Sequence, residues 1–129
     1  MIFIAKNEKG ELSWKLIQEG KKTVTRRVKP LPVGKDFAVC PGRGKFAVCR
    51  AKVISCMHHN DWINSQNPDG HLMILGIQFF NKEAQKEGFG SWSTLVNWFN
   101  KRGQDIESMF RIEFEVIRYK IVGSNGGRR

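Results

Sequence analysis

The sequence is poor in several features on which particular protein classes depend. It has three cysteines, an odd number without a C-x2-C pair, which argues against a secreted disulfide framework and against a zinc knuckle. It has no apolar run of about 18 residues and no signal-peptide pattern at its N-terminus, so we expect no membrane span and a cytoplasmic location. We find no internal repeat. A chain of 129 residues is long enough to bury a core as one domain without disulfides or metals.

The cysteines lie in apolar, strand-like surroundings rather than in ligand spacing. Cys40 and Cys49 each end a short apolar segment, and Cys56 follows in the same region as two histidines, His58 and His59. Buried thiols explain this pattern better than a zinc site, so we expect neither a metal nor a cofactor. The Gly-x-Gly at 42–44 lacks the Gly-Lys-Ser/Thr ending of a phosphate-binding P-loop, and we expect a turn there.

Acidic residues are almost missing from one third of the chain. Residues 20–60 contain ten Lys or Arg and a single acid, Asp36, a net charge of +9, whereas the whole chain carries +10. Such a concentration is typical of a surface for a polyanion, and nucleic acid is the partner that we expect. A solvated basic surface without a partner is the alternative. The basic residues are Lys21, Lys22, Arg26, Arg27, Lys29, Lys35, Arg43, Lys45, Arg50 and Lys52.

The first part of the chain predicts a short strand and a short helix. Residues 1–5 are apolar and suit an edge or barrel strand. Ser13 is suited to the N-cap of a helix, and Leu12 and Ile17 occupy the positions of a hydrophobic staple. Gly20 is expected to end this helix.

The middle of the chain predicts a hairpin. Segments 36–40 and 46–56 read as strands, and the Pro-Gly-Arg-Gly sequence at 41–44 reads as the turn between them. The second strand alternates, with one expected inner face and one basic face. The inner set is Ala47, Cys49, Ala51, Val53 and Ser55, and the basic face carries Val48, Arg50, Lys52 and Ile54.

Residues 57–71 turn polar and read as a surface loop with a helical turn around Trp62. Histidines titrate near neutral pH and therefore suit acid–base chemistry, but in a polar loop we expect them at the surface. They are His58, His59 and His71.

The last part of the chain predicts two helices and a strand. Asn81 is expected to cap a helix that runs to Glu87 and ends at Gly88, and Ser91 to cap another. Residues 110–116 alternate apolar and charged side chains, as in a half-buried strand. Residues 1–122 then form one domain, and 123–129 a flexible basic tail. The buried face of the second helix consists of Trp92, Leu95, Val96 and Phe99.

Residues 20–27 combine four cations and two hydroxyls directly after the first predicted helix. If the segment is extended, Thr25 and Arg27 share one face and Arg26 lies on the other. A turn at Lys22 would instead bring its amine beside the Thr25 hydroxyl. A lysine near other cations loses its proton more readily, and an amine beside a hydroxyl can activate a nucleophile. The alternative is a solvated basic loop.

This segment resembles the signature of the ASCH domains, a branch of the PUA-like β-barrels associated with RNA. The pattern Gly-x-Lys-x-x-x-x-Arg runs through Gly20, Lys22 and Arg27. Glutamate is common in that family where this chain has Thr25. A subgroup that hydrolyses N4-acetylcytidine carries threonine there, and its pattern Gly-x-Lys-Thr-x-Thr-x-Arg is reproduced here with Thr23.

Residues 84–89 resemble a second element of that family, an Ala-x-x-Glu run near the end of a short helix. By this match Glu87 corresponds to the acidic residue that completes the active site of the amidohydrolase subgroup. A surface carboxylate at a helix end is the alternative. The resemblance as a whole implies an α+β fold, a small PUA-like (ASCH) mixed β-barrel with short flanking helices.

Two functions from different classes follow as hypotheses. In the first, an amidohydrolase removes the acyl group from N4-acetylcytidine or a related nucleoside, with Thr25 as nucleophile, Lys22 as base and Glu87 handling the proton of the amine or orienting the lysine. In the second, a non-catalytic module uses the same basic cleft to bind RNA. The expected partner is RNA or a modified nucleoside. The expected binding residues are Gly20, Lys21, Arg26, Arg27, Arg50 and Lys52.

Overall fold

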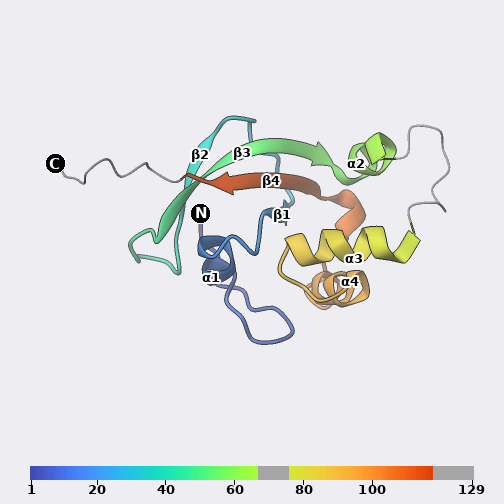
Figure 1. The fold of residues 1–129 in the computed structure, drawn as a ribbon, viewed down its shortest axis with the longest axis horizontal. Helices are drawn as coiled ribbons and strands as arrows, with labels where there is room; N and C mark the ends of the chain where they lie inside the picture. Colours follow the sequence, from blue (N-terminus) through green and yellow to red (C-terminus); the bar gives the residue numbers. More distant parts are fainter. Residues whose placement is uncertain (67–75, 118–129) are drawn as a thin grey trace.

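Four antiparallel strands form the centre of the computed structural model, which describes residues 1–66 and 76–117. The strand order is β1-β4-β3-β2, and helices α1, α3 and α4 lie on one side of the sheet while α2 follows the end of β3 (Figure 1). The protein is therefore α+β, as predicted. In chain order the elements are α1 (Ser13–Gln18), β1 (Val24–Arg27), β2 (Asp36–Val39), β3 (Cys49–His58), α2 (His59–Gln66), α3 (Gly76–Lys86), α4 (Trp92–Asn100), the 3-10 helix η2 (Ile106–Ser108) and β4 (Phe110–Val116).

The predicted barrel is wrong, because the sheet of the described residues is open. β1 pairs with β4 and β2 pairs with β3, so the two four-residue strands stand at opposite edges. Residues 1–5 do not form the predicted strand; Ile2 makes an isolated bridge to Cys40 just beyond β2. Edge strands this short offer few backbone groups for pairing across a closed barrel.

The predicted hairpin is confirmed, but β3 begins at Cys49 rather than at residue 46, so that Ala47, predicted on the inner face, lies before the strand and is exposed. β2 and β3 pair antiparallel, and Ala51 and Val53 are buried while Arg50 and Lys52 are exposed. A bulge at Ile54 then shifts the register. Cys56 rather than Ser55 therefore lies opposite buried Ile112, which corrects the predicted inner face.

Of the three predicted helix N-caps, Ser13, Asn81 and Ser91, only Ser91 is confirmed. The Ser91 hydroxyl accepts a hydrogen bond from the Thr94 N–H and caps α4, as predicted. Ser13 is not a cap but the first residue of α1, and its N–H donates to the Ala5 carbonyl instead. Asn81 lies inside α3, where its Oδ1 accepts the Trp92 N–H and ties α3 to the start of α4.

The predicted polar loop is largely regular structure. β3 continues to His58, and α2 occupies residues 59–66. His59 and Trp62 are the buried residues of that helix, so the prediction of a surface histidine is wrong for His59. His71 and the predicted tail at 123–129 lie outside the described residues.

The helix ends at α1 and α3 share one geometry. After α1, Gly20 has φ +80°, its N–H donates to the Ile17 carbonyl, and the N–H of Lys21 donates to the Leu16 carbonyl. After α3, Gly88 has φ +94°, and the same pair of hydrogen bonds recurs from Gly88 and the residue after it. These are Schellman motifs, which turn the chain sharply at a glycine. The residues beside both glycines are thereby held in defined positions.

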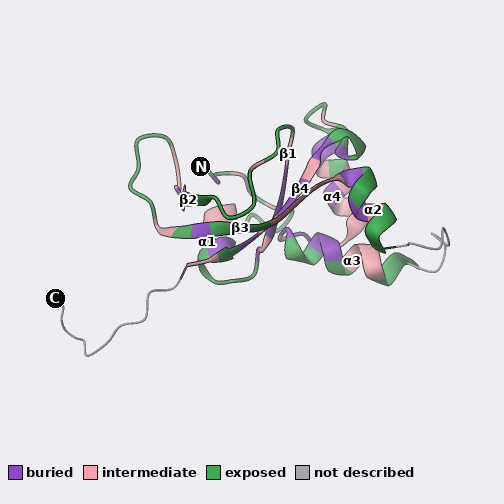
Figure 2. Cartoon of the chain, turned by 90° about the horizontal axis from the view of Figure 1, so that it is seen from above, coloured by how far each residue is buried: buried purple, intermediate pink, exposed green. Residues whose placement is uncertain are grey.

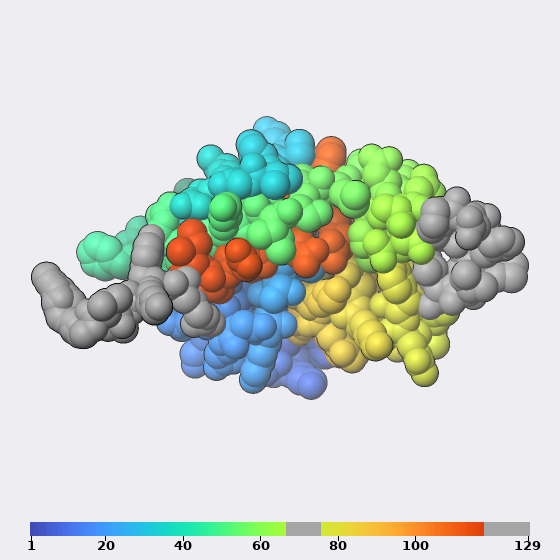
Figure 3. Space-filling model, turned by 45° about the horizontal axis from the view of Figure 1, so that its top comes forward, coloured from blue at the N-terminus to red at the C-terminus, as the bar shows by residue number. Residues whose placement is uncertain are grey.

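Two apolar clusters stand beside each other under the sheet. The first joins the N-terminal segment and α1 to the strands, and the second joins α3, α4 and η2. Figure 2 shows that β1 and β4 are largely buried while the connecting loops are exposed. Space-filling atoms of the N-terminal region and of α3 lie side by side below β4 (Figure 3). The first cluster is Phe3, Ile17, Phe37, Val39, Ala51, Val53, Ile112 and Phe114; the second is Ala84, Phe89, Leu95, Phe99, Ile106 and Met109.

A glycine-to-alanine pair tests the junction between α1 and α3. Both Gly88 and Gly103 have positive φ, but an added Cβ at Gly88 would lie 2.8 Å from Leu16 Cδ1, whereas at Gly103 it meets nothing within 4 Å. Gly103→Ala should lose about 1 kcal/mol of unfolding free energy from backbone strain. Gly88→Ala should lose about 2 kcal/mol or more, since overpacking adds to the strain. Urea unfolding measures both, and equal losses would show that Leu16 yields without cost.

Candidate functional site

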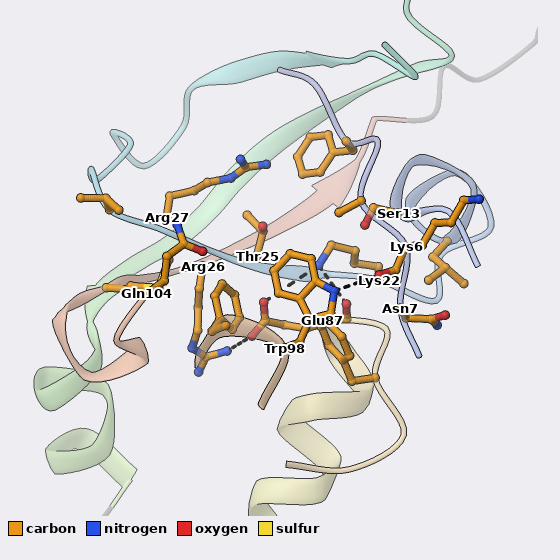
Figure 4. Close-up of a pocket in the computed structure, with 17 residues that line it drawn as sticks. Lys6, Asn7, Ser13, Lys22, Thr25, Arg26, Arg27, Glu87, Trp98 and Gln104 are labelled. Atoms are coloured by element: carbon orange, nitrogen blue, oxygen red, sulfur yellow. Dashed lines mark hydrogen bonds and ion pairs between the residues drawn. The ribbon is translucent and has the colours of Figure 1, made fainter. Parts of the chain in front are cut away.

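A cavity of about 270 Å³ opens between the two apolar clusters (Figure 4). Its volume is near the lower end of ligand sites in proteins, roughly 300 to 1,000 Å³, and suits one small molecule or a single base. The edge strand β1 and the end of α3 supply its ionisable groups, and aromatic residues from both clusters supply its walls. The lining includes Phe3, Asn7, Lys22, Thr25, Arg27, Glu87, Phe89, Trp98, Phe99 and Gln104.

Lys22 enters this cavity from the Schellman turn that ends α1. The residue is 5% exposed, and its Nζ donates to the Val24 carbonyl at 3.0 Å and to the Glu87 carbonyl at 2.9 Å. The N–H of the next residue, Thr23, donates to the Lys86 carbonyl, so the backbone also joins this turn to α3. Both carbonyl contacts therefore fix the position of the amine relative to the strand and to the helix end.

The surroundings of Lys22 weaken its hold on its proton. Burial lowers the pKa of Lys22 from 10.5 to about 8, the Glu87 carboxylate opposes this, and the charges of Arg27 and Arg26 add to the lowering. At pH 7 about one-tenth of the lysine is therefore neutral, against a negligible fraction for an ordinary lysine. A buried amine in this range can take up a proton near neutral pH.

Thr25 and Arg27 face the cavity from β1. They lie opposite Ile112 and Phe110 of β4, which places both on the core side of the sheet. Thr25 is 5% exposed, and the Arg27 guanidinium lies 4.9 Å from the centre of the Phe3 ring. Burial lowers the pKa of Arg27, while Glu87 opposes the shift.

Glu87 lies at the Schellman turn of α3 and is 3% exposed. Its Oε1 is 4.0 Å from Lys22 Nζ, and its Oε2 accepts a hydrogen bond from Arg26 Nη1. Residues 22 and 87 are thus brought together although 65 positions separate them in the sequence. The alternative of a surface carboxylate is excluded by its burial.

Arg26 differs most from its predicted place. Its side chain is fully buried and paired with Glu87 and, at 3.0 Å, with Glu83. Its Cζ lies 5.1 Å and 5.5 Å from the ring centres of Trp62 and Trp92. Arg26 also lines the cavity. Because two carboxylates and two indoles already engage its guanidinium, its role as a binding residue stays a prediction.

The remaining predicted binding residues lie away from the cavity. Gly20 forms the turn after α1, and Lys21 is exposed, with its Nζ 3.5 Å from a Glu19 oxygen. Arg50 and Lys52 alternate with the buried residues of β3 and project from the opposite face of the sheet. The cavity and the basic strand therefore form two separate surfaces.

None of the three cysteines, and neither of the described histidines, His58 and His59, lines the cavity. Burial lowers the pKa of His59 to about 4, with the charges of Arg26 and His58 adding to the effect, so this imidazole is neutral near pH 7. The cysteines are half-buried rather than fully buried, and no disulfide joins the three. Among residues 1–66 and 76–117, no group of three or more His, Cys, Asp or Glu could hold a metal ion. No described helix is long and apolar enough to cross a bilayer.

The sequence analysis did not identify Glu83, the second carboxylate that pairs with Arg26, or Arg111, the second guanidinium that pairs with Glu83. Glu83 also pairs with Arg111, whose Nη2 lies 3.1 Å from its Oε1, and both side chains are buried. The available signal was spacing, since Glu83 and Glu87 are four residues apart on α3 and share one side of the helix end. Two acids on one side of a helix, in a chain with an excess of cations, indicate buried partners.

The ionisation of Lys22 makes a prediction about stability. Its pKa is about 8 when folded and 10.5 as a free group, so the unfolded chain binds more protons between these values and stability rises with pH in that window. The wild type should gain about 3 kcal/mol relative to Lys22→Met from pH 8 to 10.5. Urea unfolding across this range measures the difference.

The matched control is the exposed neighbour, Lys21→Met, which should keep the wild-type rise. A constant difference between wild type and Lys22→Met across the window would contradict the burial of an ionisable amine.

Comparison with known proteins adds two distant structural likenesses. No protein-family profile matches the sequence, and a search of curated proteins finds no similar sequence. A protein of Enterococcus faecalis V583 from the family DUF984 is similar with a TM-score of 0.40 and 16% identity, over 90% of this chain and 78% of that one. The ASCH domain of Lactobacillus crispatus JV V101 is similar with a TM-score of 0.41 and 16% identity, over 88% and 76%. At this level neither likeness assigns a family or an activity to the chain.

Proposed function

We propose that the protein is an amidohydrolase that removes the acyl group from an N4-acylated cytidine or a related small amide. The observation that carries the proposal is the buried amine of Lys22, which shares one cavity with the Thr25 hydroxyl and lies beside Glu87. A nucleophile, a base with a lowered pKa and a carboxylate that orients the base are the parts that amide hydrolysis by a hydroxyl requires.

The two carbonyl contacts of Lys22 suit its role as a base. A neutral amine has two N–H groups and one lone pair. The carbonyls of Val24 and Glu87 accept the two N–H groups, at 3.0 and 2.9 Å. The lone pair is then left for a third partner in the cavity, and the Thr25 hydroxyl is the nucleophile that lines it.

The first half of the reaction forms an acyl-enzyme. Thr25 Oγ1 attacks the amide carbonyl carbon while Lys22 Nζ accepts the hydroxyl proton. The Arg27 guanidinium stabilises the oxyanion of the tetrahedral intermediate. The C–N bond then breaks, the proton on Lys22 passes to the leaving amine, and the acyl group remains as an ester on Thr25.

The second half returns the enzyme to its starting state. Lys22 takes a proton from a water molecule, which attacks the ester carbonyl. The carboxylic acid leaves, and Thr25 Oγ1 regains the proton from Lys22. Arg26 holds Oε2 of the Glu87 carboxylate, and its Oε1 stabilises the transient ammonium of Lys22. These contacts favour a role of Glu87 in orienting Lys22 rather than in transferring a proton.

The choice of an acylated base rests on the cavity and on the sequence pattern. A volume of about 270 Å³ fits one modified base, and Trp98, Phe89 and Phe99 offer apolar walls. Gln104 can donate and accept hydrogen bonds at a base edge. The resemblance of residues 20–27 to the N4-acetylcytidine subgroup of ASCH proteins points to the same substrate class.

Mutants assayed with N4-acetylcytidine test the proposal. Thr25→Val and Lys22→Met should each lower kcat at least about 1,000-fold, and the double variant should be hardly worse, because residues that act as one unit are not additive. The wild-type rate should rise with pH up to about 8, where Lys22 loses its proton, and then level off. Release of cytidine, separated by chromatography, is the measurement.

Thr23→Val is the matched control, because this hydroxyl belongs to the same segment but does not line the cavity. It should keep most of the activity, and circular dichroism should show that every variant is folded. Full activity of Thr25→Val would overturn the assignment of the nucleophile.

A second candidate is RNA binding on the outer surface. Of the ten cations at 20–60, seven are exposed, which leaves a basic surface that the cavity chemistry does not need. Arg50 and Lys52 contribute to it from β3, on the face of the sheet opposite the cavity. RNA could be bound here whether or not the cavity is catalytic.

Salt dependence tests this second candidate. Each neutralised phosphate of single-stranded RNA contributes a slope of about −0.7 to log K against log salt. Removal of two contacts in the double variant Arg50→Ala/Lys52→Ala should make the slope shallower by about 1.4 and leave nucleoside hydrolysis unchanged. Lys101→Ala, an exposed cation after α4, is the control and should leave the slope as it is. An unaltered slope in the double variant would exclude this surface.

A further inference from the structure

A chain of buried charges leads away from the cavity on the side opposite Thr25. Lys22 is followed by Glu87, Arg26, Glu83 and Arg111, so that positive and negative groups alternate. Arg111 and Glu83 do not line the cavity. Figure 4 shows Arg26 reaching Glu87 from the strand that carries Thr25. Arg26 lines the cavity, whereas Glu83 and Arg111 can affect a ligand there only through the charged groups that precede them in this chain.

Arg26 is held from every side. Glu83 Oε2 pairs with its Nη2 at 3.0 Å, and Trp62 and Trp92 lie against its guanidinium with ring centres 5.1 and 5.5 Å from Cζ. None of its side chain is exposed. A buried cation fixed in this way stays in place at the wall of the cavity, and it presents one donor, Nη1, to Glu87 Oε2.

The pairing with Arg26 gives the two carboxylate oxygens of Glu87 different partners. Oε2 accepts a hydrogen bond from Arg26, whereas Oε1 lies 4.0 Å from Lys22 Nζ, a distance longer than that of a hydrogen bond. The lysine hydrogen bonds go to two backbone carbonyls instead. Without Arg26, the whole carboxylate would be free to close onto Lys22 and hold it as an ammonium.

We infer that Arg26 is a positioning residue, which occupies one oxygen of Glu87 and so prevents a direct hydrogen bond between the carboxylate and Lys22 that would keep Lys22 from acting as a base. The inference rests on the proposed function, in which Lys22 is the base. Three charged groups act on Lys22, Glu87 from the end of α3 and Arg26 and Arg27 from β1, while Lys6 also lines the cavity but is exposed. Of these, Arg26 alone contacts the carboxylate in the described part of the chain.

The test follows the ionisation of Lys22 directly. The Cε carbon of 13C-labelled lysine reports protonation by NMR, and Lys22→Met identifies its signal. In Arg26→Met the pKa of Lys22 should rise by about 1 pH unit or more, because a nearby cation is lost and Glu87 is released. In Glu87→Gln it should fall, since the stabilising anion is lost. The rising limb of the pH–rate profile should move with the pKa in Arg26→Met.

Arg111→Met is the matched control. Arg111 is also buried, also paired with Glu83, and its Cζ lies 5.2 Å from the Trp62 ring, but it does not contact Glu87. It should lower stability as Arg26→Met does and leave the titration of Lys22 in place. Equal titration shifts in both variants, or none in Arg26→Met, would overturn the inference and leave Arg26 a structural ion pair.

Two further outcomes separate this inference from the proposed function. If Arg26→Met does not fold, Arg26→Lys replaces it; this variant keeps a charge but cannot bridge both carboxylates, and an unchanged Lys22 titration in it would overturn the inference. If the wild type hydrolyses no acylated cytidine while the titration shifts occur as expected, the proposed function fails and the control of Lys22 by Arg26 stands.

Discussion

The contact between Arg26 and Glu87 joins parts of the molecule that the apolar core alone would leave less well defined. The first apolar cluster belongs to the sheet and α1, and the second to α3, α4 and η2. Apolar surfaces tolerate small shifts, whereas a buried charge that loses its partner costs several kcal/mol. The ion pair, together with the backbone bond from Thr23 to Lys86, therefore fixes the end of α3 against β1. The cavity lies at this junction.

The parts of the fold that could be predicted carry their signal within a few neighbouring residues. The alternation of β4, the Ser91 cap of α4 and the β2–β3 hairpin each follow from local side-chain pattern and turn chemistry. The helical turn predicted around Trp62 extends to a full helix, α2, whose length was not predicted because its two buried residues, His59 and Trp62, give a polar helix little periodicity. The bulge at Ile54 and the open sheet depend on pairing between distant strands, which the local sequence pattern does not predict.

The residues of the candidate site likewise differ in how far the local sequence predicts them. Lys22 and Thr25 are three residues apart, so a turn before a strand is enough to bring both to one cavity. The role of Glu87 was predicted from a resemblance to a family and not from any property of its own helix. The spacing of Glu83 and Glu87 indicated a buried partner but not which one, because an ion pair between Glu83 and Arg111, 28 positions apart, has no period. Their partnership becomes visible only when the helix end meets the sheet.

The distribution of charge acquires a different meaning once burial is known. The segment 20–60 carries +9 as a sequence, but Lys22 and Arg26 lie inside the protein and face carboxylates supplied by α3. These two cations serve the cavity, where low solvation makes each charge effective on its neighbours. The seven exposed cations remain in water, where salt screens them and where they act on a polyanion as a field rather than as individual groups. Catalysis at the cavity and binding at the outer surface can therefore change independently, since different side chains of one basic segment serve each.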